Sequence, residues 1–144
     1  MNEIHASCFF SEDIRHETTG CSSLIGVFGG VVDVAEFPVT FPKFGIFSRI
    51  YVPKVITIQK VSIKIVSNKS PELVMGLDMP DDDLQKLLAT PPAEDSFGYS
   101  FDLNGVASLM TVEAPCRWEF FARINDEEVW GGGIRFVQQD TQKT

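Results

Sequence analysis

The chain has 144 residues, 44% hydrophobic and 22% charged, which suits one domain with its own core and excludes wholesale disorder. Twenty acidic residues against twelve Lys and Arg give a net charge of −8, and the basic residues form no cluster, so we expect no nucleic-acid partner. A basic leader with an apolar segment and a long apolar run are both missing from the sequence, so we expect a cytoplasmic protein without a membrane partner.

The amino-terminal part alternates between apolar and polar residues, which predicts a strand over residues 4–11. The polar passage 12–20 is expected to turn the chain around, and a second strand follows over 24–28, so the two form a long hairpin. Gly29-Gly30 is expected to break the second strand, because glycine in a strand pattern often marks a bulge or a close backbone approach. Pairing is expected to resume over 31–34.

Residues 43–52 form the third long predicted strand, which Pro53 ends. After Pro53 the phase of the apolar residues changes, which predicts a bulge or break near Gln59, followed by strands over 61–65 and 72–77.

The segment 81–89 is the one helix that the pattern predicts. Asp81 can cap its first turn, and Leu84, Leu87 and Leu88 form an apolar stripe at helical spacing. After the helix, alternation over 97–103, the turn signal Asn104-Gly105 and apolar residues over 106–112 predict another hairpin.

The clearest pattern is the hairpin formed by residues 116–137. Its first arm has Cys116, Trp118, Phe120, Ala122 and Ile124 on one face, with a turn expected over 126–128. Matching the apolar faces pairs Phe120 with Ile134 and Trp118 with Phe136, which would also set Glu119 opposite Arg135 and Phe121 opposite Gly133. The turn lacks glycine, so we expect an irregularity there.

Short alternating strands separated by turns, with one helix, predict a single all-β domain over 1–144. We expect an antiparallel two-sheet β-sandwich, immunoglobulin-like in the loose sense, with a closed barrel as the alternative. Residues 138–144 are expected to be a frayed tail.

Four segments together resemble a family of small uncharacterised bacterial and phage β-sandwich proteins of unknown function. They are Ala6-Ser7-Cys8, the segment 24–28, Phe41-Pro42-Lys43 and the carboxy-terminal hairpin. The resemblance implies a bacterial or phage origin and a sandwich fold, and it carries over no catalytic residue.

Metal chemistry finds little support in the pattern. His5, Cys8, Glu12, Asp13, His16 and Cys21 lie within one predicted hairpin without the spacing of a zinc site. The acidic stretch from Asp78 to Asp83 lacks the glycine and closing glutamate of a calcium loop, and helix capping explains it better. Three cysteines without a leader predict reduced thiols.

Catalytic motifs are missing too: there is no nucleophile elbow, and the glycine-rich stretches 26–30 and 131–133 lack the ending of a phosphate loop. Backbone crowding is the better account of both stretches. We therefore expect no catalytic residue, no metal and no cofactor.

A second apolar surface remains. Phe47, Tyr51 and Phe121 lie opposite the predicted core face, with Arg49 and Arg123 beside them, and aromatic residues with arginine are typical of interfaces. Either these residues contact another protein or a second copy, or the helix or residues 37–41 cover them.

Three functions follow from these patterns. The sequence favours a non-enzymatic protein-binding or self-assembling module. The alternative is a small-ligand or ion-binding sandwich that uses end loops, chiefly Asp78 to Asp83, Glu94, Asp95 and Asp126 to Glu128. An enzyme is the least favoured.

Overall fold

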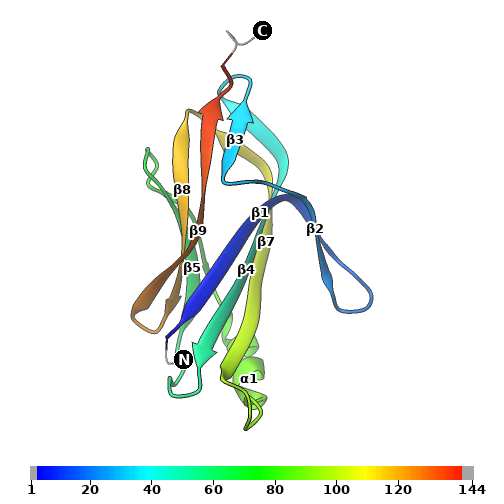
Figure 1. Ribbon diagram of the computed structural model, residues 1–144, viewed down its shortest axis with the longest axis vertical. Helices are drawn as coiled ribbons and strands as arrows, with labels where there is room; N and C mark the ends of the chain where they lie inside the picture. Colours follow the sequence, from blue (N-terminus) through cyan, green and yellow to red (C-terminus); the bar gives the residue numbers. More distant parts are fainter. Residues whose placement is uncertain (1–2, 141–144) are drawn as a thin grey trace.

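The computed structural model describes residues 3–140 and consists of two facing β-sheets and one short helix (Figure 1). The first sheet has the order β2-β1-β4-β7, with β1 (His5–His16), β2 (Ser22–Val27), β4 (Val39–Pro53) and β7 (Gly98–Val112). The second has the order β3-β9-β8-β5-β6, with β3 (Val31–Val34), β5 (Val61–Ser67), β6 (Leu73–Asp78), β8 (Cys116–Ile124) and β9 (Glu127–Gln138). The predicted all-β sandwich is confirmed, and its neighbouring strands are antiparallel except for β3 and β9.

The core lies between the sheets and is rich in aromatic rings. Phe44 of β4 is fully buried at its centre, with five rings at centroid distances of 5.5 to 6.3 Å from its own. These rings belong to Phe10, Phe28, Phe41, Trp118 and Phe136. The alternation predicted for residues 43–52 is correct, because β4 points Phe44, Ile46, Ile50 and Val52 into this core.

The helix α1 (Asp81–Ala89) joins the edge strand β6 of the second sheet to the edge strand β7 of the first (Figure 1). Its apolar stripe packs on the core through buried Leu84, as the spacing predicts. The predicted cap is wrong: Pro80 is the N-cap, and Asp81 is already helical and makes no capping hydrogen bond. The acidic first turn still favours the positive end of the helix.

The amino-terminal hairpin exists, but its first strand is longer than predicted. β1 continues through the polar residues to His16, because β2 offers partners from Ser22 to Val27, and the turn shrinks to residues 17–21. The second strand ends before Gly29-Gly30, as expected. Residues 31–34 then cross to the other sheet, where β3 pairs with β9 in parallel.

The hairpin predicted at Asn104-Gly105 is wrong. β7 runs without a turn from Gly98 to Val112 and pairs along its length with β4, which also has 15 residues. A long partner strand therefore overrides the local turn signal. The ladder is interrupted at Leu109, which has φ 55° and faces Pro42 across the pair.

The carboxy-terminal hairpin has the predicted buried face but a different register. Trp118 pairs with Ile134 and Phe120 with Gly132, so the predicted pairs Phe120–Ile134 and Trp118–Phe136 are wrong. The turn consists of Asn125 and Asp126 rather than 126–128, since Asn125 itself adopts φ 55°.

The irregularity expected at that turn lies further along β9, at Gly131. Phe121 pairs with Trp130 and Phe120 with Gly132, so Gly131 forms a bulge. The predicted pairs of Glu119 with Arg135 and of Phe121 with Gly133 are therefore wrong as well.

Crowding explains the glycine run 131–133, as expected. A Cβ on Gly131 would lie 2.7 Å from Cδ1 of Phe120 and 3.2 Å from the Cβ of Ala6 in the other sheet. A Cβ on Gly132 would lie 3.0 Å from the carbonyl oxygen of Cys8. The same account is wrong for Gly29 and Gly30, which have open space around them.

Two further predictions concern the ends of the chain and the membrane. β9 extends to Gln138 and the N–H of Gln139 donates to the carbonyl oxygen of Val34, so the predicted start of a frayed tail at residue 138 is wrong, and residues 141–144 lie outside the described part. Within residues 3–140, the one helix is too short to cross a bilayer.

Candidate functional site

The residues predicted for an interface lie on two separate surfaces. Phe47, Arg49 and Tyr51 of β4 face away from the core on the first sheet. Phe121 and Arg123 of β8 face away from the core on the second sheet. The structure therefore brings the first three together and leaves the other two on the opposite side of the sandwich.

On the outer face of the first sheet, Arg49 is held in place by Asp102. Its Nε and Nη2 donate to the two carboxylate oxygens at 2.7 and 3.1 Å, and its guanidinium lies 5.6 Å from the centre of the Phe47 ring. The hydrogen bond to Asp102 raises the pKa of Arg49. This face also contains Phe9, which pairs with Phe47 and is 51% exposed. In the alternation of residues 4–11, Phe9 shares the phase of the polar residues His5 and Ser7, so the pattern gives no signal for it.

On the outer face of the second sheet, paired charges surround the aromatic residues. Trp130 is 58% exposed and pairs with Phe121, and its indole Nε1 donates to Glu119 at 2.6 Å. Lys64 lies over the Phe121 ring and forms an ion pair with Glu128 at 2.8 Å. Because these charges are already paired, this surface offers few free groups to a partner.

The free edge of the first sheet is the long strand β7. Among the described residues 3–140 it pairs with β4 alone, and its only charged residue is Asp102, which Arg49 already binds. The other terminal strands are much shorter, with six residues in β2, four in β3 and six in β6. Natural edge strands are commonly protected by lysine, proline or shortness, and the 15-residue β7 has none of these.

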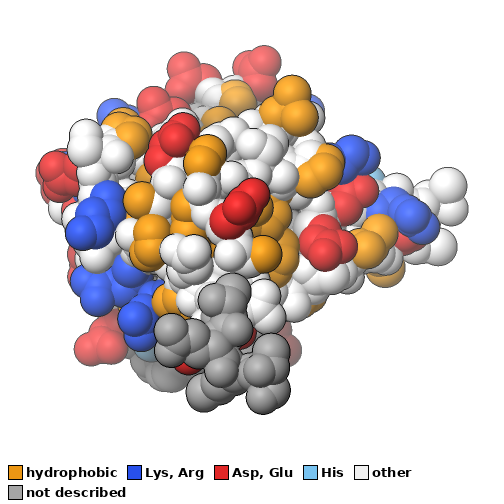
Figure 2. All heavy atoms as spheres, turned by 90° about the horizontal axis from the view of Figure 1, so that it is seen from above, with side chains coloured by type: hydrophobic (Ala, Val, Ile, Leu, Met, Phe, Trp, Pro, Cys, Tyr) orange, Lys and Arg blue, Asp and Glu red, His pale blue; other side chains and the backbone are white. Residues whose placement is uncertain are grey.

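Two large apolar side chains flank the regular part of β7. Phe97 precedes the strand and is 71% exposed, and Leu109 interrupts its ladder and is 73% exposed. At the end of the molecule where β9 finishes, Figure 2 shows hydrophobic side chains toward the middle, with several Lys and Arg side chains next to one another at one margin.

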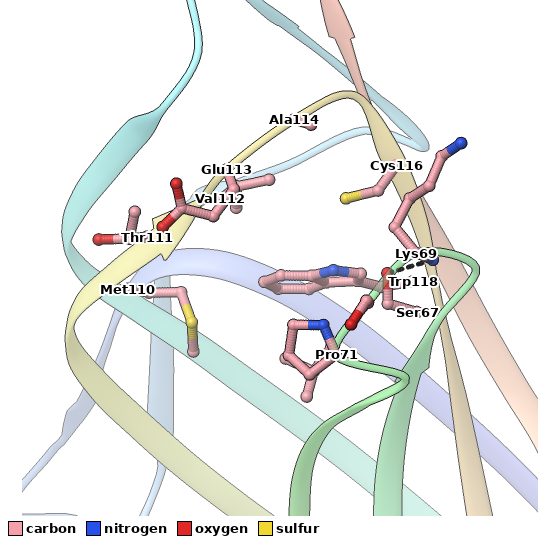
Figure 3. Close-up of a pocket in the computed structure, with 12 residues that line it drawn as sticks. Ser67, Lys69, Pro71, Met110, Thr111, Val112, Glu113, Ala114, Cys116 and Trp118 are labelled. Carbon is pink, nitrogen blue, oxygen red and sulfur yellow. Dashed lines mark hydrogen bonds between the residues drawn. The ribbon is translucent and has the colours of Figure 1, made fainter.

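A cavity of about 200 Å³ opens between the sheets where the edge strands β6 and β7 separate. We call it the Trp118 cleft. Figure 3 shows the flat indole of Trp118 across its middle, with Pro71 and Met110 near the ring and the Cys116 sulfur pointing toward the opening. The lining is mainly apolar: Pro71, Val74, Met110, Val112, Ala114, Cys116 and Trp118, with Ser67, Lys69, Ser70, Thr111 and Glu113 as its polar members.

The thiol of Cys116 lies in the wall of the cleft, and its pKa is shifted. Burial raises this pKa, and hydrogen bonds from Ser67 and Trp118 together with the positive charge of Lys69 act in the opposite direction. Because burial dominates, the thiol stays protonated at neutral pH. The thiol is therefore a neutral, polarisable group in the lining of the cleft and not an activated nucleophile.

The titratable residues of the amino-terminal hairpin are dispersed. Cys8 packs on the core, where burial raises its pKa to about 12, while Cys21 is exposed. Asp13 pairs with Lys43 at 3.4 Å, and His16 lies 3.4 Å from Ser22. His5 and Glu12 are exposed.

The acidic end loops, Asp78 to Asp83, Glu94, Asp95 and Asp126 to Glu128, are exposed apart from half-buried Met79. The Trp118 cleft lies at the opposite end of β6 from Asp78, next to the β5–β6 turn. Throughout residues 3–140, no three His, Cys, Asp or Glu side chains are grouped closely enough to hold a metal ion.

Comparison with known proteins adds no relative: no family model, curated protein or solved structure matches the chain. The resemblance to small bacterial and phage sandwich proteins stays a prediction.

Proposed function

We propose that the protein is a non-enzymatic assembly module that pairs with a second copy of itself along the free edge of β7. The observation that carries the proposal is the combination of length and missing protection in this strand. Adding a strand to such an edge gives main-chain hydrogen bonds and needs no preformed pocket. The only charge of the strand, Asp102, is neutralised by Arg49, so two copies can approach without an unpaired like charge.

The backbone of β7 indicates how two copies would pair. The carbonyl oxygen of Leu103 is turned toward β4, where it accepts a hydrogen bond from Ser48 Oγ. In an antiparallel ladder the backbone groups of successive residues face opposite sides. The N–H and C=O groups of Ser100, Asp102, Asn104 and Val106 therefore face the free edge.

One symmetric register also covers the exposed apolar residues. A two-fold axis beside Leu103 pairs each residue with the one at the same distance on the other side of Leu103 in the second copy. Phe97 and Leu109 are both six positions from Leu103, so each copy sets its Phe97 beside the partner's Leu109. The register buries two pairs of apolar side chains that are more than 70% exposed in the single chain, at 71% and 73%.

The same register defines a charge-reversal experiment. It places Ser100 opposite the partner's Val106, and both residues are exposed, with Val106 at 43%, so lysine at either position leaves the isolated fold intact. The double variant Ser100→Lys/Val106→Lys sets two like-charged pairs across the axis and is expected to be monomeric. Mixing it with Ser100→Glu/Val106→Glu is expected to restore a mixed dimer, measured by light scattering and native mass spectrometry.

The matched control uses the outer face of the same sheet. Phe9→Lys adds one charge at a site 51% exposed that lies away from β7, and it is expected to leave the dimer unchanged. A wild-type protein that is monomeric at all concentrations would refute the proposal. Loss of the dimer in Phe9→Lys, with the β7 variants still dimeric, would assign assembly to the sheet face instead.

We also propose that the protein is cytoplasmic. The three free cysteines support a reducing compartment, because none of them forms a disulfide.

A further inference from the structure

Strand pairing brings together two arginines that are distant in the sequence. Arg117 of β8 and Arg135 of β9 are direct partners in the antiparallel ladder, and both are exposed on the outer face of the second sheet. The N–H of Arg135 donates to Gly30, toward β3, while the N–H and C=O of Arg117 bond with Asn68, toward β5. The two arginines therefore form a pair without mutual backbone hydrogen bonds, which is the closer kind, with Cα atoms about 4.5 Å apart.

The charge of Arg135 is not balanced by its neighbours. Within residues 3–140 no carboxylate forms an ion pair with Arg135, although the chain has a net charge of −8. On the other side of β9 its partner is Val31 of β3, and the acidic residue of that strand, Asp33, lies opposite Val137. Like charges directly opposite each other destabilise an antiparallel pair. The pair of Arg117 and Arg135 therefore lowers the stability of the isolated fold.

The groups around this pair are hydrogen-bond donors in fixed orientations. Nε of Arg117 forms an ion pair with Glu119 at 3.0 Å, so its two terminal amino groups stay free for another partner. Asn68 Oδ1 accepts from the N–H of Arg117 at 2.8 Å, so the amide NH₂ of Asn68 is turned away from that bond. Asn68, Arg117 and Arg135 line one groove, together with Pro115, Cys116, Phe136 and Val137. This lining contains no carboxylate, and the positive charge of Lys69 acts on Cys116 beside it.

We propose that this groove, the Arg117–Arg135 groove, binds a phosphate dianion, either free phosphate or the terminal phosphate group of a small molecule. A dianion between the two guanidinium groups replaces their repulsion by two charge-assisted contacts, and the planar fork of arginine matches phosphate oxygens. The three terminal oxygens of a phosphate group can accept from Arg117, Arg135 and Asn68 together. The net charge of −8 disfavours a long polyanion such as nucleic acid. This inference does not depend on pairing through β7.

Nuclear magnetic resonance of the arginine Nε–H signals in the full-length chain tests the proposal, at constant ionic strength. The chain has five arginines, and single Arg→Gln variants assign their signals. Inorganic phosphate is expected to shift the signals of Arg117 and Arg135 saturably and to leave those of Arg15, Arg49 and Arg123 in place. Methyl phosphate, also a dianion, is expected to act in the same way. Dimethyl phosphate has one charge and two terminal oxygens, so it is expected to bind about tenfold more weakly or worse.

Substitutions of Arg135 separate binding from folding, because this exposed side chain has no ion-pair partner within residues 3–140. Arg135→Gln is expected to weaken phosphate binding by about tenfold or more. Arg135→Lys keeps the charge but loses the planar fork, so its affinity is expected to lie between those of Arg135→Gln and the wild type. Arg123→Gln is the matched control. It removes a charge from the same face of β8, where Arg123 pairs with Asp126 at 3.6 Å, and is expected to bind like the wild type.

Thermal unfolding gives an independent readout. Phosphate stabilises proteins in general by exclusion from their surface, and a bound phosphate adds stability that grows with its concentration. Phosphate is therefore expected to raise the unfolding midpoint of the wild type and of Arg123→Gln more than that of Arg135→Gln. Equal rises in all three proteins, parallel shifts of all five arginine signals, or equal affinities for methyl and dimethyl phosphate would overturn the proposal.

Discussion

Replacing Phe44 by alanine tests the aromatic core that joins the two sheets. Phe44 is fully buried and contacts five other rings, so the substitution removes a whole ring from a site where the neighbours cannot all move inward. Phe→Ala in a core costs about 3 to 5 kcal/mol, and the number of ring contacts favours a cost of about 4. With a urea m-value of about 1.5 to 2 kcal/mol per molar, the midpoint should fall by about 2 to 3 M.

The assay is urea unfolding followed by far-ultraviolet circular dichroism. Phe44→Leu keeps most of the volume and is expected to lose about 1 to 1.5 kcal/mol. Phe9→Ala removes the same ring from a half-exposed site on the outer face, 51% exposed, and should cost less than about 1 kcal/mol. Equal losses for Phe44→Ala and Phe9→Ala would refute the placement of Phe44 at the centre of the core.

Three further predictions concern local features of the fold. Gly131→Ala is expected to cost about 1 to 3 kcal/mol, because its Cβ would lie 2.7 Å from a ring carbon, whereas Gly105→Ala, with open space, should change thermal unfolding little. Asn125→Gly keeps the φ of 55° but loses three side-chain hydrogen bonds, so it should lower the free energy of unfolding by about 2 kcal/mol. Asn125→Ala should cost about 1 kcal/mol more in chemical unfolding, because alanine tolerates this φ less well than glycine. Burial raises the pKa of Cys8 to about 12, so the neutral thiol contributes to stability below its ordinary pKa, and this contribution is lost as the pH rises through about 12. The free energy of unfolding should therefore fall at alkaline pH. Cys8→Ala should remove the part of this fall that is due to the buried thiol, and Cys21→Ala should not. An equal decline in both cysteine variants would contradict the burial of Cys8.

The sequence predicted features that depend on short-range patterns. Alternation along β4 and β8 identified the residues that face the core, and the leucine spacing located α1. These predictions succeed because side chains alternate between the two faces of a strand and recur on one face of a helix every three or four residues, whichever segment packs against that face. The phase change near Gln59 was equally local, and residues 54–60 do form a break between β4 and β5.

Pairing between distant segments was harder to predict. The turn signal at Asn104-Gly105 failed because β4 is long enough to pair with the entire stretch, and nothing near residue 104 in the sequence reveals that. The predicted register of β8 and β9 is wrong because β9 has one extra residue, Gly131, in a bulge that depends on contact with the other sheet. Matching apolar faces fixes a register only to within two residues, since a shift of two keeps the same face buried.

Predicting the candidate site from the sequence met the same obstacle. The unusual aromatic residues on β4 and β8 were recognised, but their assignment to different sheets requires the strand order. The Trp118 cleft was not predicted at all, because its walls combine residues near 70 with residues near 112 and its existence depends on the separation of two strand edges.

The free edge and the cleft have one structural cause. The glycines of β9 let it lie almost on top of β1, with the added Cβ of Gly131 only 3.2 Å from the Cβ of Ala6, so the sandwich is closed on that side. Large rings such as Phe44 and Trp118 fill the space further across and hold the sheets apart toward β6 and β7. Strands that are held apart cannot pair with each other, which leaves the outer edge of β7 unpaired within residues 3–140 and opens a cavity between the edges. α1 joins the two edges at one end of β6 and β7 only, so within residues 3–140 the cleft at the other end and the outer edge of β7 stay uncovered.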